Sequence, residues 1–263
     1  MTRNNYKLLI ILFFYLITPI LHASDLAKEK RWADQIVDAL ITGDAEWLPA
    51  GDLKVLSIYT PSDTEPARGA AIILHGIGVH PDWPDVIHPL RTRLPEAGWA
   101  TLSVQMPILP NEANGIDYLP LLPEVLPRID AAIDFLQAQG INNIVIIAHS
   151  LGTVMTSYYL NKQPASEVRA YIGISMTEIE TDSRISNVAM LKNITIPVLD
   201  IYGSLDEAHV RDFAQQRQQS AISANNPAYQ QIEIKEANHF YNGKDDKLLE
   251  VIQGWISNYA TTK

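Results

Sequence analysis

The sequence contains no cysteine, no long hydrophobic run beyond residue 23, and fewer basic than acidic side chains. Without cysteine the chain has no disulfide bond, thiol nucleophile, thiolate metal ligand or lipid-modified cysteine. The 20 Lys and Arg residues against 30 Asp and Glu residues give a formal net charge of −10, which argues against binding to nucleic acid or to anionic lipid headgroups. A transmembrane helix needs about 20 apolar residues, so we expect no membrane span after residue 23.

The first 23 residues have the layout of a secretory signal peptide. Arg3 and Lys7 precede an apolar run from Leu8 to Ile17, and Leu21-His22-Ala23 ends in a small residue suited to cleavage. The apolar run is short for a full membrane span, and an uncleaved N-terminal anchor is the alternative. The sequence therefore predicts export, and an exported chain without cysteine is consistent with the bacterial periplasm.

The chain has 263 residues, 47% of them hydrophobic, which suits a single globular domain with a substantial core, over residues 24–263. Apolar residues recur on one side of residues 25–42, as expected of an amphipathic helix. We therefore expect residues 24–50 to form a helical extension on the outside of the domain. The alternation of Lys54 to Tyr59 predicts an edge strand.

Short apolar, mostly β-branched runs alternate with helical patterns along the rest of the chain. Such runs are typical of strands buried on both faces of a parallel sheet. The runs and the helices between them predict an α/β fold, in which a doubly wound, mostly parallel sheet carries helices on both faces. The expected strands lie within 70–74, 98–107, 144–147, 168–175, 197–203 and 229–234.

The strand at 144–147 leads into the turn Ala148-His149-Ser150-Leu151-Gly152, and the residues after it have a helical pattern. A serine at a sharp strand-to-helix turn has strained backbone geometry and raises its hydroxyl above the sheet edge. Only small residues fit two positions before and two after that serine, and Ala148 and Gly152 are small. This stretch resembles the nucleophile elbow of the α/β-hydrolases, although their usual pattern has glycine at both positions.

A second resemblance covers residues 75–107. Two segments are similar to an exported bacterial α/β-hydrolase family of unassigned function: His80-Pro81-Asp82-Trp83-Pro84 and the strand within 98–107. This resemblance implies the α/β-hydrolase fold and a serine hydrolase site, and it implies no substrate. The segment between Ser175 and Ile196 is too short for the large cap domain that many such enzymes carry, so we expect a minimal cap and an open site.

The resemblance also implies residues that stabilise a negative oxygen. In these hydrolases, the loop after the strand at 70–74 and the residue after the nucleophile each supply a backbone N–H to the oxyanion hole. In this sequence those donors are Ile77, within His75-Gly76-Ile77-Gly78, and Leu151. Preorganised N–H dipoles stabilise the tetrahedral intermediate of acyl transfer.

The acid and the base follow later in the chain. The family places its acid just after the strand at 197–203, which implies Asp206; Asp200 within the strand and Glu207 are the competing carboxylates. It places its general base between the last strand and the last helix, which implies His239. The order Ser150, Asp206, His239 is the Ser-acid-His order of the superfamily.

Two further groups of residues have less support. Trp83, Met106, Met176 and Tyr241 belong to segments expected near the site and are candidates for an apolar acyl pocket, but ordinary packing explains each equally well. A metal site from His75, His80 and Asp82 is conceivable, but their spacing matches no helical ligand pattern. We therefore expect no metal and no cofactor.

These observations favour a serine hydrolase that works through an acyl-enzyme. The most plausible activity is that of a carboxylesterase or thioesterase on a small or medium acyl substrate. Its partner would be a small ester-like molecule. The alternative is a non-catalytic envelope protein that keeps the hydrolase fold for binding or as a scaffold, because a fold does not imply a function.

Overall fold

The computed structural model describes residues 24–163, 167–226 and 228–259. The predicted signal peptide, residues 1–23, lies outside the described residues. Within the described part, eight strands form one sheet in the order β1-β2-β4-β3-β5-β6-β7-β8. The strands are β1 (Asp44–Ala50), β2 (Leu53–Thr60), β3 (Gly69–Leu74), β4 (Trp99–Val104), β5 (Ile144–His149), β6 (Val168–Ile174), β7 (Val198–Gly203) and β8 (Tyr229–Ile234).

Helices connect the strands. They are α1 (Leu26–Ala39), α2 (Ile87–Arg93), α3 (Leu122–Ala138), α4 (Leu151–Lys162), α5 (Asn187–Met190), α6 (Ala208–Arg211), α7 (Ala214–Ser223) and α8 (Asp245–Tyr259). Three short 3₁₀ segments are η1 (Pro95–Ala97), η2 (Gly115–Leu121) and η3 (Leu191–Asn193).

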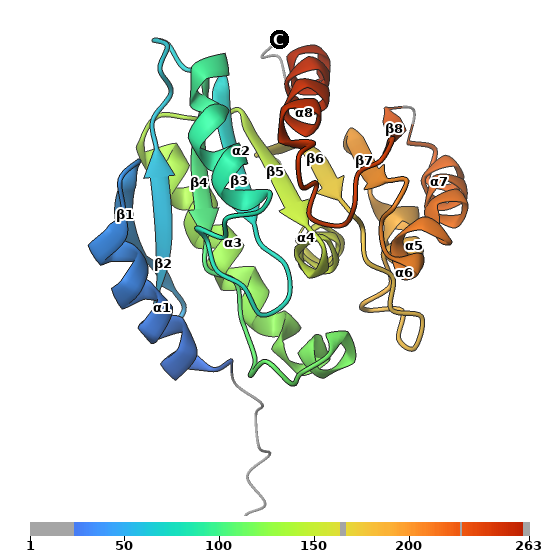
Figure 1. The fold of residues 1–263 in the computed structure, drawn as a ribbon, viewed down its shortest axis with the longest axis horizontal. Coiled ribbons are helices and arrows are strands. Elements are labelled where there is room, and N and C mark those ends of the chain that lie inside the picture. Colours follow the sequence, from blue (N-terminus) through green and yellow to red (C-terminus); the bar gives the residue numbers. More distant parts are fainter. Residues whose placement is uncertain (1–23, 164–166, 227, 260–263) are drawn as a thin grey trace, which may run out of the picture.

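Strands β3 to β8 run parallel, whereas β1 and β2 pair antiparallel at one end of the sheet. Every residue of β3, β4 and β5 is buried, which explains why these strands read as continuous apolar runs. Helices α3 and α4 cover one face of the sheet and α2 and α8 the other, with a hydrophobic core on each side (Figure 1). The expected doubly wound, mostly parallel sheet is confirmed.

The N-terminal region differs from the sequence prediction in two respects. Residues 24–50 are not all helical, because residues 44–50 form strand β1 after α1. Strand β1 pairs along the outer side of β2, so Lys54 to Tyr59 belong to the second strand rather than to an edge strand. Strand β1 was not predicted because it contains a proline and charged residues, and its buried and exposed residues do not alternate regularly.

Helix α1 packs on the sheet as an amphipathic helix. Ala33 and Ile36 lie against Leu56 and Ile58 of β2. These four side chains form a small core that is separate from the core beneath α3. Asp25 caps the helix, because its side chain accepts a hydrogen bond from the Lys28 amide at 2.9 Å. None of the described helices is long and apolar enough to cross a bilayer.

The carboxyl ends of the parallel strands share one edge of the sheet, which is the lower edge in Figure 1. Ligand sites of open α/β sheets lie at this edge, because the loops that leave the strands surround it. Between β6 and β7 the chain forms only α5, η3 and short loops, so no cap domain separates this edge from solvent.

Candidate active site

Ser150 lies at the turn between β5 and α4, with φ 54° and ψ −126°. A non-glycine residue in this region is strained, and the surrounding packing must hold it there. Gly76 lies beside the turn, and a Cβ atom on it would approach the Ser150 Cβ to 3.0 Å. The backbone thus holds Ser150 at the carboxyl edge of the sheet in the conformation that the sequence predicted.

Gly152 is required by the same turn. A Cβ at Gly152 would lie 2.6 Å from the His75 carbonyl oxygen and 2.8 Å from that of Leu74. Both contacts are with backbone, so the loop after β3 would have to move. We expect Gly152→Ala to destabilise the protein by about 1–3 kcal/mol and to slow any reaction at Ser150. Urea unfolding and the rate of Ser150 labelling would measure the two effects.

Gly254 in α8 provides the matched control, because a Cβ there meets nothing within 4 Å. Gly254→Ala should stabilise the protein by about 0.5–1 kcal/mol, since alanine loses less conformational entropy in a helix. An unfolding free energy for Gly152→Ala equal to that of the Gly254 variant would refute the packing role of Gly152.

Three side chains predicted from the sequence come together at this edge. The Ser150 Oγ lies 3.0 Å from His239 Nε2, and His239 Nδ1 lies 2.7 Å from Asp206 Oδ1. Asp206 follows β7 and His239 follows β8, so both reach Ser150 from neighbouring strands. With Nδ1–H donating to the carboxylate, His239 Nε2 is free to accept the hydroxyl proton of Ser150.

The Asp206 carboxylate accepts several hydrogen bonds. Ser175 Oγ donates to its Oδ2 at 2.5 Å, and the Glu207 amide donates to its Oδ1 at 2.8 Å. Burial raises the pKa of this carboxyl, but the hydrogen bonds from His239 and Ser175 outweigh burial and hold the pKa below its usual value. Asp206 is therefore ionised at neutral pH, as a partner of His239 requires.

The two competing carboxylates lie elsewhere. Asp200 is fully buried within β7 and pairs with Arg217, whose Nε donates to Oδ2 at 2.7 Å. Glu207 is exposed and forms an ion pair with His209 at 3.2 Å. Neither carboxylate contacts His239, so only Asp206 has the geometry of the acid.

Two backbone amides belong to residues that line the cleft around Ser150, Ile77 and Leu151. Neither Ile77 nor Leu151 donates its N–H to any other residue that the structure describes. The Ile77 loop is braced by His75, whose Nδ1 donates to the Gly76 carbonyl at 2.9 Å and whose Nε2 accepts from the Met106 amide at 2.9 Å. Burial lowers the pKa of His75 to about 3, so this ring stays neutral.

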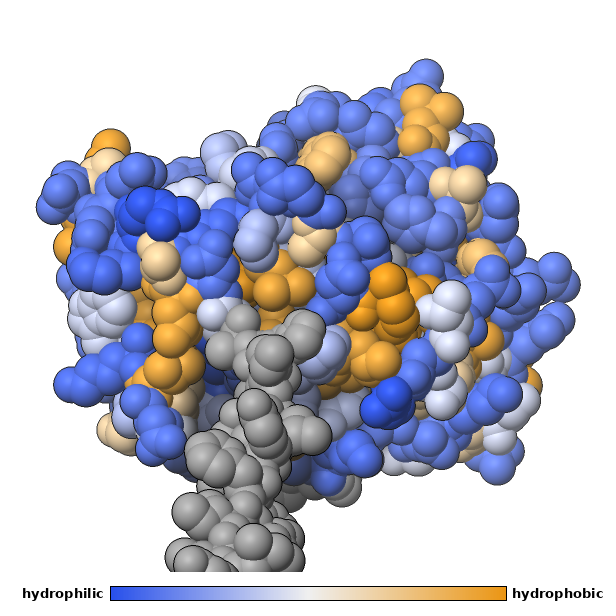
Figure 2. Space-filling view, turned by 90° about the horizontal axis from the view of Figure 1, so that it is seen from below, coloured by the Kyte–Doolittle hydropathy of each residue, from blue (hydrophilic) through white to orange (hydrophobic). Residues whose placement is uncertain are grey.

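Ser150 opens onto a cleft of about 440 Å³. Its walls come from the loops after β3, β6, β7 and β8 and from the start of η2. Figure 2 shows this face, where hydrophobic side chains gather near the middle. Of the hydrophobic residues that line the cleft, Ile77 and Phe240 are exposed. The cleft is lined by Gly76, Ile77, Val79, Trp83, Asn114, Gly115, His149, Ser150, Leu151, Thr177, Glu178, Ile179, Glu207, His209, His239 and Phe240.

Of the four candidate pocket residues, only Trp83 lines this cleft. Met106, Met176 and Tyr241 are fully buried in the cores beneath it. Met106 and Met176 closely follow strands β4 and β6, and Tyr241 lies in the loop between β8 and α8; all three side chains are directed into the core. The prediction that these three line an acyl pocket is wrong, and Ile77, Val79, Ile179 and Phe240 supply the apolar wall instead.

Other residues near the site were missed. Ser175 directly follows β6, at the strand end beside β7, and this position could have marked it as a neighbour of the acid. His149 Nε2 lies 2.9 Å from the His239 carbonyl oxygen and holds the His239 loop against the elbow. Burial and the neighbouring His239 lower the pKa of His149 to about 4, so this imidazole acts as a neutral brace.

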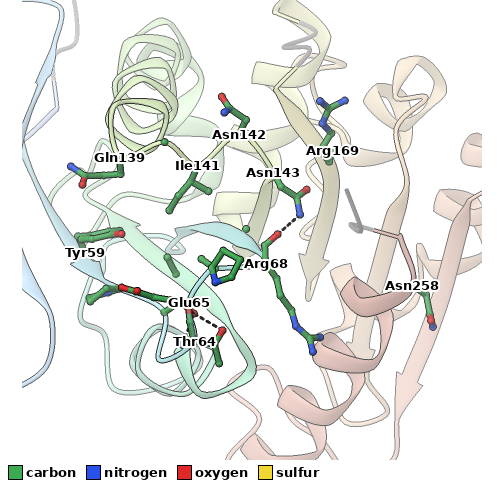
Figure 3. A pocket seen from close by; sticks show the side chains of 17 residues that line it. Tyr59, Thr64, Glu65, Arg68, Gln139, Ile141, Asn142, Asn143, Arg169 and Asn258 are labelled. Atoms are coloured by element: carbon green, nitrogen blue, oxygen red, sulfur yellow. Dashed lines mark hydrogen bonds between the residues drawn. The ribbon is translucent and has the colours of Figure 1, made fainter. Parts of the chain in front are cut away.

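A larger hollow, of about 1050 Å³, lies at the opposite end of the sheet between the loop before β3 and the loop before β5. Figure 3 shows the guanidinium groups of Arg68 and Arg169 pointing in opposite directions, and the Asn143 side chain donating to the Arg68 carbonyl oxygen at 2.7 Å. No serine of this hollow contacts a histidine among the described residues. The smaller cleft at Ser150 is therefore the candidate active site.

His80 and Asp82, which the sequence offered as candidate metal ligands, have other partners. His80 Nδ1 accepts from the Asp82 amide at 3.2 Å, and Asp82 accepts from Arg91 at 2.6 Å. No group of three or more His, Asp or Glu side chains within the described residues is arranged to hold a metal ion.

Solved structures similar to this chain are α/β-hydrolases. An α/β serine hydrolase without lid from Xanthomonas campestris is 16% identical, with a TM-score of 0.63 over 84% of this chain and 97% of that chain. A dienelactone hydrolase from Anabaena variabilis is 17% identical, with a TM-score of 0.61 over 83% and 98%. An esterase domain from a Rhodothermus marinus protein is 15% identical, with a TM-score of 0.60 over 84% and 100%.

These similarities show that the chain has the α/β-hydrolase fold that its elbow motif implied. No curated protein matches the chain. A family model described as "Protein of unknown function (DUF3530)" matches residues 18–116 and 121–258, which is most of the sequence. The chain belongs to this DUF3530 family.

Proposed function

We propose that this protein is a serine hydrolase that cleaves carboxylic esters or thioesters through an acyl-enzyme, with residues 24–263 acting as one hydrolase domain. The observation that carries the proposal is the hydrogen-bonded series Ser150–His239–Asp206. The Ser150 Oγ lies 3.0 Å from His239 Nε2, and His239 Nδ1 lies 2.7 Å from Asp206 Oδ1. A serine in a strained elbow, with an imidazole on its hydroxyl and an ionised carboxylate behind that imidazole, is the arrangement of an activated nucleophile.

Each residue then has a defined task. The Ser150 Oγ attacks the substrate carbonyl carbon while its proton passes to His239 Nε2. The carbonyl oxygen becomes an oxyanion, which the N–H groups of Ile77 and Leu151 stabilise. Collapse of this intermediate expels the leaving group, which takes the proton from His239. Water, deprotonated by His239, then attacks the acyl-serine, and the acid product leaves as Ser150 is restored.

The cleft supports an acyl group of small or medium size. Its volume of about 440 Å³ and its walls of Ile77, Val79, Ile179 and Phe240 suit an apolar acyl chain. The similar solved structures include an esterase domain and dienelactone hydrolases, and this agrees with ester chemistry.

A fluorophosphonate probe tests the proposal directly, because it phosphonylates only an activated serine. The purified protein should incorporate one probe molecule, and peptide mass spectrometry should locate it on Ser150. A folded protein that takes up no probe at any pH between about 6 and 9 would contradict the proposal.

The charges around the cleft predict which esters it accepts. Glu178 and Glu207 are among its lining residues, and no Lys or Arg is, within the described part of the chain. We expect kcat/KM for an acyl ester ending in a carboxylate to be lower by about tenfold or more than for the neutral ester of equal length, because like charges repel. Steady-state hydrolysis of p-nitrophenyl butyrate and of the matching succinate half-ester would measure this ratio.

A pair of charge reversals controls that measurement. Glu207→Lys should reduce the preference for the neutral ester, whereas Glu236→Lys should not, because Glu236 is exposed but does not line the cleft. Equal kcat/KM values for the two esters in the unmodified protein would exclude a role of these carboxylates in selection.

We also propose that the protein is exported, with residues 1–23 as its signal peptide, and that it acts in a bacterial periplasm. The basic residues, the apolar run and the small residue at position 23 support this.

A further inference from the structure

Ser24, the first described residue, is held unusually tightly for a residue that precedes a helix. Its backbone N–H donates to Glu124 Oε1 at 3.1 Å, and its hydroxyl donates to Glu124 Oε2 at 2.8 Å. Arg128 Nη2 also donates to the Ser24 hydroxyl oxygen at 3.3 Å. Ser24 is buried as a result. One carboxylate of helix α3 therefore binds both the nitrogen and the hydroxyl of one residue, 100 positions earlier in the chain.

An acidic residue in the first turn of a helix is common, because it interacts favourably with the helix dipole. Glu124 occupies this position in α3. The dipole explains an acid at this position, but it does not explain why both carboxylate oxygens turn to Ser24. The two contacts instead match the geometry of a carboxylate that binds an amino alcohol.

The charges around Ser24 are unbalanced. Arg128 is fully buried and forms an ion pair with Glu29, with Nη1 and Oε2 3.0 Å apart, and its Nη2 lies 3.6 Å from Glu124. Two carboxylates thus share one guanidinium, which leaves one negative charge without a partner in this cluster. Burial raises the pKa of Glu29, and the nearby Arg128 guanidinium only partly opposes this effect. One additional cation at the Ser24 nitrogen would balance the cluster.

Cleavage of the proposed signal peptide after Ala23 supplies that cation. Hydrolysis of the Ala23–Ser24 bond consumes one water and leaves a carboxylate on Ala23 and an α-ammonium group on Ser24. The ammonium nitrogen is the atom that already lies 3.1 Å from Glu124. A charge-assisted hydrogen bond of this kind is about twice as strong as one from a neutral amide.

We propose that Glu124, with Arg128 and Glu29, forms a binding site for the protein's own processed N-terminus, the α-ammonium and hydroxyl groups of Ser24. The inference rests on the export proposed above and not on the hydrolase chemistry. Hydrogen bonds link this site to the loop after β3, because Arg128 Nη1 donates to the Gln105 carbonyl oxygen at 2.8 Å and Gln105 Nε2 lies 3.1 Å from His75 Nε2.

The test uses the full chain, produced in an exporting bacterium and purified after processing. Mass spectrometry of the N-terminal peptide should find Ser24 as the first residue. Periodate oxidises an N-terminal serine only when its amine and hydroxyl are both accessible, and converts it to a glyoxylyl group. Because Glu124 binds both groups, we expect oxidation of the folded protein to be at least about tenfold slower than oxidation in urea.

Two variants separate a specific site from general burial. Glu124→Gln should speed oxidation of the folded protein several-fold and lower Tm by about 3–8 °C, because a charge-assisted pair is lost. Glu112→Gln, an exposed carboxylate outside the cluster, should change neither value. A first residue other than Ser24, or equal oxidation rates for the unmodified chain and Glu124→Gln, would overturn the proposal. Neither readout depends on Ser150, so a failure here leaves the hydrolase proposal untouched.

Discussion

Ester hydrolysis should fall by at least about 10⁴-fold in Ser150→Ala, because removing the nucleophile of such a site leaves only binding and oxyanion stabilisation. Alanine keeps the Cβ atom of serine, so the substitution adds no strain to the backbone at φ 54°. Among the described residues, the buried Ser150 hydroxyl forms hydrogen bonds with His239 and, at 3.4 Å, with Thr177. The Tm should therefore stay within a few degrees of the unmodified value, since losing one buried hydrogen bond costs about 1 kcal/mol.

Initial rates with p-nitrophenyl butyrate and fluorophosphonate labelling are the two measurements for this variant. Ser62→Ala is the control, because Ser62 lines the hollow at the opposite end of the sheet and its hydroxyl forms hydrogen bonds with Thr64 rather than with a histidine. It should hydrolyse and label like the unmodified chain. Hydrolysis at the normal rate by a folded Ser150→Ala protein would place the chemistry on another group and end the assignment of Ser150.

The second large effect concerns the acid. In Asp206→Asn, the amide nitrogen would face His239 Nδ1, and the ring would have to protonate Nε2 instead. That tautomer cannot accept the Ser150 proton, so we expect kcat to fall by about 10⁴-fold while the ester still binds. Steady-state kinetics should show the loss in kcat rather than in KM.

Asp200→Asn is the informative comparison, because Asp200 was the other candidate acid. It leaves Arg217 buried without its charge partner and should destabilise the fold by about 3–5 kcal/mol. The protein that remains folded should nevertheless label with fluorophosphonate at the normal rate per folded molecule. If Asp200→Asn abolished labelling and Asp206→Asn did not, the acid that supports His239 would be Asp200 rather than Asp206.

The local patterns of the sequence predicted the fold class well, and the three side chains that the resemblance implied, Ser150, Asp206 and His239, lie within hydrogen-bonding distance of one another in series. Fully buried parallel strands need apolar residues on both faces, so β3, β5 and β6 are visible as short apolar runs without any knowledge of the fold. A strand-to-helix turn around Ser150 needs small neighbours, which the sequence displays as Ala148 and Gly152.

The pocket could not be predicted in the same way. Whether a side chain next to a strand end lies in the cleft or in the core depends on the path of the loop, and several distant segments determine that path. Tyr241, at φ 56°, turns back beneath the site and its hydroxyl lies 3.3 Å from Ser175 Oγ, whereas its neighbour Phe240 lines the cleft. Adjacent residues of similar character thus have opposite surroundings.

The amino-acid sequence by itself determined that this chain forms a doubly wound sheet and which serine occupies its elbow, because both depend on short-range patterns of size and hydrophobicity. Only the tertiary structure showed that Asp206 pairs with His239 whereas Asp200, inside the same strand, pairs with Arg217. It also brought Ser24 to Glu124 across 100 residues. Contacts of that kind arise from the packing of whole elements, and no local pattern encodes them.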